Sequence, residues 1–181
     1  CVEFDYFEGN DSEYFIPEVI GIEEIKRIET GELSATQKSY KAFWGDLLGQ
    51  LKEKEPSIRT HQSALTVNAI EIPIGYGSIH LEWAFHGQPR SWFEVGLHFE
   101  KPSEQENKKL YEHFVSLKRE IESELGGLEL ESEFPWMTRC ARIYASKQEG
   151  QMTEELKDWA LHTMLKFYSV FKPRLDKFLR S

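Results

Sequence analysis

The chain has 181 residues, of which 40% are hydrophobic and 13% aromatic, and its formal net charge is -9. This composition excludes a disordered chain, because there is enough apolar surface for one domain with a sizeable core. No apolar run reaches the ~18 residues of a membrane-spanning helix, and the start lacks the basic flank and apolar stretch of a signal peptide. Two cysteines, Cys1 and Cys140, cannot form a disulfide framework. We therefore expect a cytoplasmic protein that does not contact membranes.

The negative charge is concentrated near the N-terminus. Residues 1–32 carry ten acidic and two basic side chains, whereas the other 149 residues carry 21 acidic and 20 basic ones. Such an acidic chain is not typical of broad, nonspecific DNA binding. We expect two parts, an acidic leader or linker from an upstream region over residues 1–32 and a single domain over residues 33–181. The first residue is not Met, so we also expect a fragment or a processed chain.

Apolar residues at helical spacing predict three helices. The first covers about residues 35–53, after a capping box formed by Ser34 and Gln37. The second covers about residues 104–125, and the third begins near residue 154. Pro173 is expected to kink or break the third helix, because proline has no backbone N–H to donate.

Between the first and second helices the hydrophobic period changes to two, which predicts strands. Strict alternation covers residues 79–86 and 91–99, after a looser strand and a connection over residues 73–77. A second hairpin is predicted between the second and third helices. The order α-β-β-β-α-β-β-α with hairpin-length connections predicts an α+β fold. We expect a single antiparallel sheet of about five strands, with helices packed mainly on one face.

The register of the middle hairpin follows from its apolar face. Pairing Phe85 with Phe93 places the apolar residues of both strands on one side, whereas a slip of one residue would turn a whole strand over. His80 then lies opposite His98 on the other side of the sheet. If residues 141, 143 and 145 face the core, Arg142 and Tyr144 lie on that same polar side.

These polar side chains form a candidate ligand-binding site. Directly opposed residues have Cβ atoms about 5 Å apart, so two imidazoles and nearby carboxylates share one patch. Such groups can bind a divalent metal or transfer protons, and arginine and tyrosine can contact phosphate, carboxylate or a nucleobase. The simpler interpretation is a solvated polar face. The candidate residues are His80, Glu82, Trp92, Glu94, His98, Arg142 and Tyr144.

We expect no metal at this site, because only two imidazoles converge there and no thiolate joins them. We also expect no cofactor and no catalytic residue. A second candidate site, for nucleic acid, is basic and includes most of the positive charges near the C-terminus. Its members are Lys147, Lys172, Arg174, Lys177 and Arg180. The helix dipole alone accounts for much of this cluster.

Four segments together resemble a known protein family: KAFW at 41–44, KREIESELG at 118–126, ARIY at 141–144 and FYSVFKPR at 167–174. The family is bacterial and archaeal, and it is known only as a domain of unknown function. It often lies C-terminal to a PD-(D/E)XK restriction-endonuclease-like nuclease domain. The resemblance covers about residues 33–180 and implies no catalytic residues. It also implies that the leader belongs to an upstream domain or linker.

The nuclease chemistry itself is not expected in this chain. It needs an acid-x-Lys motif on a strand beside another acidic residue, and the match at 24–26 lies in the leader. We therefore expect a non-catalytic accessory domain of a nuclease or DNA-defence protein, which provides protein contact or substrate recognition. The alternative is a small-ligand or metal-binding domain, or an enzyme, that uses the polar face. The expected partner is a protein or the upstream nuclease domain, and weak nucleic-acid contact and a homodimer stay open.

Overall fold

The computed structural model describes residues 2–9, 12–19, 33–60, 65–87 and 90–180. These residues fall into two compact units, Cys1–Lys38 and Ser39–Ser181. The first unit contains an antiparallel hairpin of strands β1 (Val2–Gly9) and β2 (Ser12–Val19), which the sequence analysis did not predict. The acid-x-Lys match at 24–26 lies outside the described residues.

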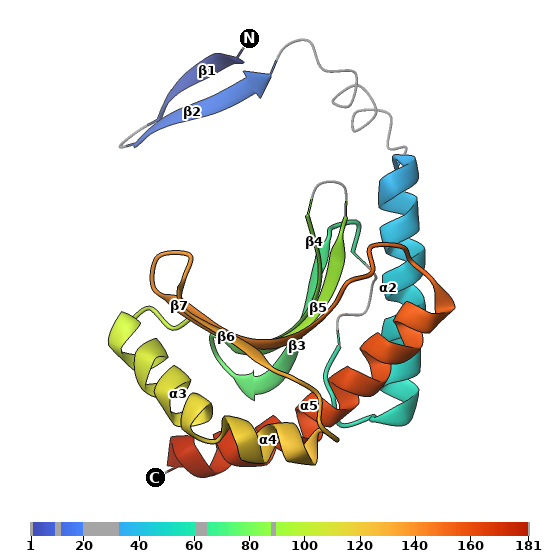
Figure 1. Ribbon diagram of the computed structural model, residues 1–181. Coiled ribbons are helices and arrows are strands. Elements are labelled where there is room, and N and C mark those ends of the chain that lie inside the picture. Colours follow the sequence, from blue (N-terminus) through green and yellow to red (C-terminus); the bar gives the residue numbers. More distant parts are fainter. Residues whose placement is uncertain (1, 10–11, 20–32, 61–64, 88–89, 181) are drawn as a thin grey trace. The chain divides into compact units, whose positions relative to one another are not determined.

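The second unit is built on one antiparallel sheet with the strand order β3-β4-β5-β7-β6 (Figure 1). The strands are β3 (Ala69–Tyr76), β4 (Ile79–His86), β5 (Trp92–Phe99), β6 (Glu131–Trp136) and β7 (Cys140–Lys147). Strands that follow one another closely in sequence pair as hairpins. The predicted α+β class and five-stranded antiparallel sheet are confirmed.

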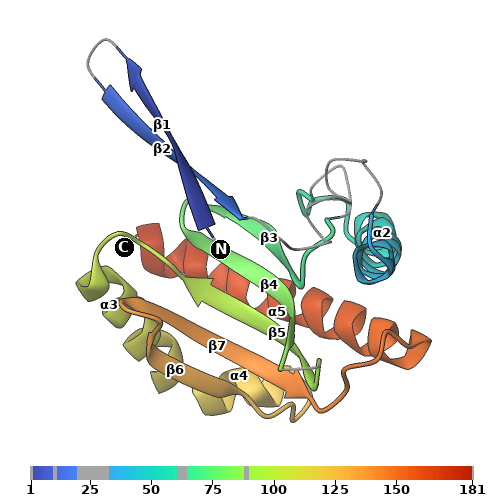
Figure 2. The ribbon, with the colours of Figure 1, turned by 90° about the horizontal axis from the view of Figure 1, so that it is seen from above.

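Four helices accompany this sheet: α2 (Ala35–Lys54), α3 (Glu104–Ser116), α4 (Lys118–Glu124) and α5 (Glu154–Arg180). They lie on one side of it, and the opposite side carries none of these helices (Figures 1 and 2). The capping box before α2 is present, because the Ser34 N–H donates to Gln37 Oε1 and the Gln37 N–H donates to Ser34 Oγ. None of the described helices is long and apolar enough to cross a membrane.

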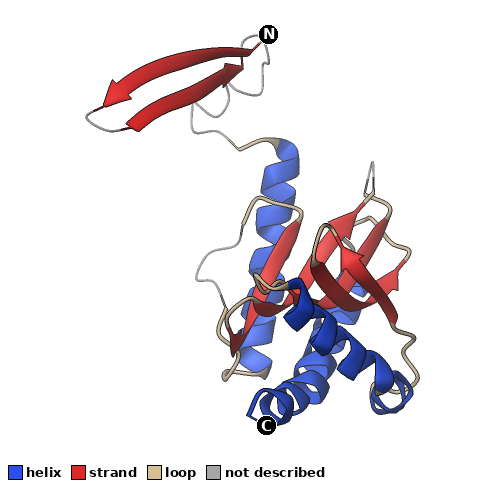
Figure 3. Ribbon diagram, turned by 90° about the vertical axis from the view of Figure 1, so that its left-hand side faces the viewer, coloured by secondary structure: helices blue, strands red, loops and turns tan. Residues whose placement is uncertain are grey.

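Three boundaries differ from the predicted ones. The second predicted helix is interrupted at Leu117, whose N–H bonds the carbonyl of Phe114, so it forms α3 and α4. The predicted connection at 73–77 is mostly strand, because β3 continues to Tyr76 across an irregularity that begins at Pro73. The helix α5 continues past Pro173 and is not broken there. The C-terminal end of the chain is thus helical (Figure 3).

The continuation of α5 has a packing reason. Leu175 is fully buried, and Phe178 and Leu179 pack against the core, all beyond the proline. A proline inside a helix costs about 3 kcal/mol, and the burial of Leu175 with the partial burial of Phe178 and Leu179 offsets a cost of that size.

The core lies between the helices and the apolar face of the sheet. Trp44 of α2 stacks on Trp83 of β4, with ring centroids 6.4 Å apart. Both indoles are fully buried. Each indole N–H nevertheless has an acceptor, the carbonyl of Val67 for Trp44 at 2.8 Å and that of Ala160 for Trp83 at 3.1 Å. These contacts fix which face of the sheet points away from the helices.

Candidate functional site

The face of the sheet that points away from the helices carries the predicted polar residues. The register is confirmed, because Phe85 pairs with Phe93, and His80 pairs with His98. Strand β7 places Arg142 opposite His98. We call this surface the polar face. It comprises Glu71, His80, Glu82, His86, Trp92, Glu94, Gly96, His98, Glu100, Glu131, Glu133, Trp136, Arg142 and Tyr144.

The centre of the polar face is buried, so the simpler expectation of a solvated face is wrong there. Only 7% of His80, 1% of Glu94 and none of His98 is exposed. The cause is mutual covering: the His98 ring stacks on His80 at 5.3 Å and meets Trp136 edge-on at 4.8 Å. Gly96 leaves the space for this packing, since a Cβ there would lie 2.8 Å from His98 Nε2.

Carboxylates surround the His98 imidazole. Its Nε2 lies 3.5 Å from Glu94 Oε1 and 3.6 Å from Glu82 Oε1, and its Nδ1 lies 3.8 Å from Glu100 Oε1. Burial disfavours the charged ring, but Glu100, Glu94 and Glu82 outweigh burial and raise the pKa of His98 to about 9. The site therefore holds concentrated negative charge that attracts a cation.

Arg142 links two of the carboxylates. Its Nη1 donates to both oxygens of Glu94, at 2.9 and 3.1 Å, and its Nε and Nη2 donate to Glu133 Oε2 at 3.0 and 2.8 Å. The guanidinium also lies over the Trp136 and Tyr144 rings. Its donors are thus engaged within the face, so Arg142 holds the carboxylates in place and does not present a free cation.

Glu94 is the anionic centre of this arrangement. Burial alone would raise its pKa, but the contacts from His86 and His98 and the charge of Arg142 lower it to about 2. Glu82 lacks such compensation, and burial raises its pKa. Burial and then the charge of His98 lower the pKa of His80. The pKa values of adjacent side chains are thus shifted in different directions because their surroundings differ.

The two remaining predicted residues extend the cluster. Trp92 stacks on His86 at 5.4 Å, and the His86 Nε2 lies 3.2 Å from Glu94 Oε2. Tyr144 donates its hydroxyl to Glu131 at 3.3 Å. All seven predicted ligand-site residues therefore lie on one face, as the register predicted.

The polar face is acidic. On the described strands and the residue after β5, six carboxylates lie on it against two cations, the guanidinium of Arg142 and the imidazole of His98 with its raised pKa. The carboxylates are Glu71, Glu82, Glu94, Glu100, Glu131 and Glu133. This charge favours cationic partners and repels phosphates.

The predicted basic cluster is largely neutralised by acids. Lys147 pairs with Glu155 at 2.8 Å, and Lys172 pairs with Asp176. Arg174 bonds Glu120 and Glu124 at 2.7 and 2.6 Å. Lys177 and Arg180 are exposed on the last turns of α5. The five residues do not form one free basic surface.

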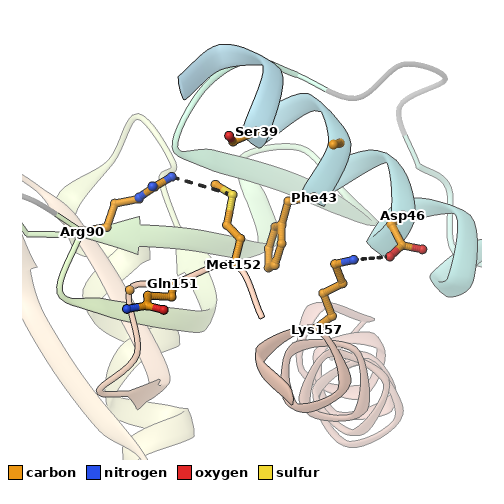
Figure 4. A pocket seen from close by; sticks show the side chains of 9 residues that line it. Ser39, Phe43, Asp46, Arg90, Gln151, Met152 and Lys157 are labelled. Carbon is orange, nitrogen blue, oxygen red and sulfur yellow. Dashed lines mark hydrogen bonds and ion pairs between the residues drawn. The ribbon is translucent and has the colours of Figure 1, made fainter. Parts of the chain in front are cut away.

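A separate cavity of about 530 Å³ lies between α2 and the start of α5 (Figure 4). In it Lys157 bonds Asp46 at 2.6 Å, and the Arg90 guanidinium lies 3.8 Å from the Met152 sulfur. The Arg90 guanidinium also packs over the Tyr40 ring. Because its charged groups already have partners, this cavity is a weaker candidate than the polar face.

Several members of the polar face were not among the predicted site residues. Glu100 continues the alternation of β5 by one residue, so its place could have been found from the period. The places of Trp136 and Glu133 could not be found in this way, because the pairing of β6 with β7 shifts register between Glu133 and Trp136. Gly96 has no side chain that would mark it as a site residue, and it matters because it leaves space for the close approach of His98.

One protein family, described as a domain of unknown function (DUF4268), matches residues 39–175 of the chain. The chain belongs to this family. The DUF4268 match begins with the second structural unit and ends within α5, so it includes the whole polar face. The resemblance to an uncharacterised domain is confirmed, and the association with a nuclease domain stays a prediction. No curated protein and no solved structure matches the chain.

Proposed function

We propose that this chain is a non-catalytic accessory domain of a nuclease or DNA-defence protein, and that it makes protein contact through the polar face. The observation that carries the proposal is an acidic face that the described helices leave uncovered, whose buried centre fixes its charges in place. A rigid charged surface needs little ordering on binding, which favours recognition.

The charge of the polar face supports protein contact over nucleic-acid contact. Six carboxylates repel the phosphates on which nucleic-acid affinity depends. A basic protein surface would meet complementary charge and the aromatic rings of Trp92, Trp136 and Tyr144, and aromatic residues are enriched in protein interfaces.

Two further observations support a non-catalytic role. On the described strands no acid-x-Lys motif occurs, so the residues that nuclease chemistry needs would come from elsewhere. The Arg142 guanidinium is occupied by Glu94 and Glu133 and is not free to stabilise a developing anion. A cytoplasmic setting fits the free thiol of Cys140.

The test uses the full-length gene product and charge reversal on the polar face. Glu71→Lys with Glu131→Lys reverses two exposed carboxylates and leaves the buried centre intact. Glu53→Lys with Glu129→Lys makes the same charge change at exposed positions outside the sheet. DNA cleavage, and binding of the separately expressed upstream domain, are measured for each pair.

We expect the polar-face pair to weaken the domain contact or the cleavage by about tenfold or more, equivalent to about 1.4 kcal/mol. The control pair should match the unaltered protein. Equal behaviour of the two pairs, or a gene that encodes no nuclease domain with this chain, would contradict the proposal.

A further inference from the structure

Three side chains on the polar face converge at the β4–β5 pair. His80, His98 and Glu100 each offer one ligand atom, and these atoms lie within 4.8 Å of one another. His80 and His98 are direct cross-strand partners, and Glu100 follows His98 by two residues on the same side. Two rigid strands therefore hold this set of groups together.

The imidazole nitrogens at this point lack hydrogen bonds. His80 Nε2 and His98 Nδ1 are buried, and neither has a hydrogen-bond partner in the described part of the chain. A buried polar group without a partner costs about 1–3 kcal/mol. A metal ion would use the lone pairs of both nitrogens and remove that cost.

The surroundings of His98 match those of metal-bound histidines. A ligating histidine usually donates its second ring N–H to a carboxylate, which fixes the ring. Here the other nitrogen, Nε2, faces Glu94 and Glu82 at 3.5 and 3.6 Å. Arg142 in turn holds Glu94. The carboxylates that stabilise a proton on His98 would also stabilise a divalent cation that replaces this proton.

We propose that His80, His98 and Glu100 bind a divalent transition-metal ion of the zinc type. Two imidazoles with one carboxylate are a typical zinc ligand set that leaves a fourth position for water or a partner group. Ligand atoms about 2 Å from a tetrahedral ion lie roughly 3.3 Å apart, so the present spacing has to shorten by up to about 1.5 Å. The Glu100 Oε1 already lies 3.8 Å from His98 Nδ1, and the Glu100 side chain is 35% exposed, which leaves it room to adjust.

This site goes beyond the protein-contact role and does not depend on it. The expectation of no metal counted only the two imidazoles. The structure adds the Glu100 carboxylate as a third ligand and the buried nitrogens that lack hydrogen bonds.

The test measures metal binding by the intact chain, purified without a polyhistidine tag and treated with a chelator. Zn²⁺ is added by calorimetric titration, and Co²⁺ is added to record the visible absorption of a tetrahedral complex. The variants are Glu100→Gln and His80→Gln. The controls are His162→Gln, an exposed histidine on α5, and Cys140→Ser, which removes the thiol on the same side of the sheet.

We expect one Zn²⁺ per chain, weakened by more than about tenfold in Glu100→Gln and His80→Gln, since even an outer-shell change has that effect. Both controls should bind as the unaltered chain does. No binding by the folded chain, binding unaffected by Glu100→Gln, or loss of binding in Cys140→Ser would overturn the proposal. Circular dichroism checks that each variant is folded. If His80→Gln does not fold, the binding measured for Glu100→Gln tests the proposal alone, because Glu100 is partly exposed.

Discussion

At the scale of single residues, Gly96 makes the packing of the polar face sterically feasible. A Cβ at this position would lie 2.8 Å from His98 Nε2, closer than Cβ atoms approach, and 3.1 Å from Glu94 Oε1, which is a tight contact. Both of those side chains are buried and held by neighbours, so they cannot move away freely. The smallest residue is therefore required at the centre of the cluster.

Gly96→Ala should lower the free energy of unfolding by about 1–3 kcal/mol, the usual cost of overpacking. Gly49→Ala is the matched control, because Gly49 is on α2 and a Cβ there would meet no atom within 4 Å beyond its chain neighbours and its own helix backbone. That change should stabilise the protein by about 0.5–1 kcal/mol, since alanine favours the helix. Urea unfolding measures both values, and a Gly96→Ala protein as stable as the original would contradict this account of the packing.

At the scale of elements, Asn107 joins the start of α3 to the sheet. Its fully buried side chain accepts from the Lys101 N–H at 2.9 Å and donates to the carbonyls of Lys101 and Arg139 at 2.9 and 3.0 Å. Lys101 follows β5, and Arg139 precedes β7. One amide thus ties the end of β5 and the start of α3 to the start of β7, 32 residues further along the chain.

Asn107→Ala should lower the free energy of unfolding by about 3 kcal/mol, because three hydrogen bonds worth roughly 1 kcal/mol each are lost. Gln105→Ala, at an exposed position of the same helix, should change it by less than about 0.5 kcal/mol. Both are measured by urea unfolding followed by circular dichroism. Similar values for the two variants would show that Asn107 does not hold these elements together.

A helix or strand could be predicted where the residues that determine it lie close together in the sequence. The β4–β5 register followed from sequence alone, because burying Phe85 and Phe93 together excludes a slip of one residue. The β1–β2 hairpin was not predicted, although Val2, Phe4 and Tyr6 alternate with acidic residues. The continuation of α5 past Pro173 depends on tertiary packing, which periodicity does not report.

At the scale of the whole molecule, the sequence predicted which residues gather at the candidate site, but it did not predict that the centre of the site is buried. Alternation placed His80, Glu94 and His98 on one face, but it could not predict that they would be buried. Burial arises from Gly96, Trp136 and Arg142, which come from three different strands. Similarly, the ion pairs of Arg174 could not be predicted from the sequence, because the acids that pair with it lie 50 and 54 positions away.

The central claim is that the acidic polar face recognises protein and not nucleic acid. Its most direct test is the fluorescence anisotropy of a labelled DNA duplex, titrated with the intact chain at several salt concentrations. We predict a dissociation constant weaker than about 10⁻⁴ M at physiological salt, and a shallow dependence on salt, because the chain has a net charge of -9 and its polar face repels phosphates. Tight binding that weakens steeply as salt increases would contradict the account.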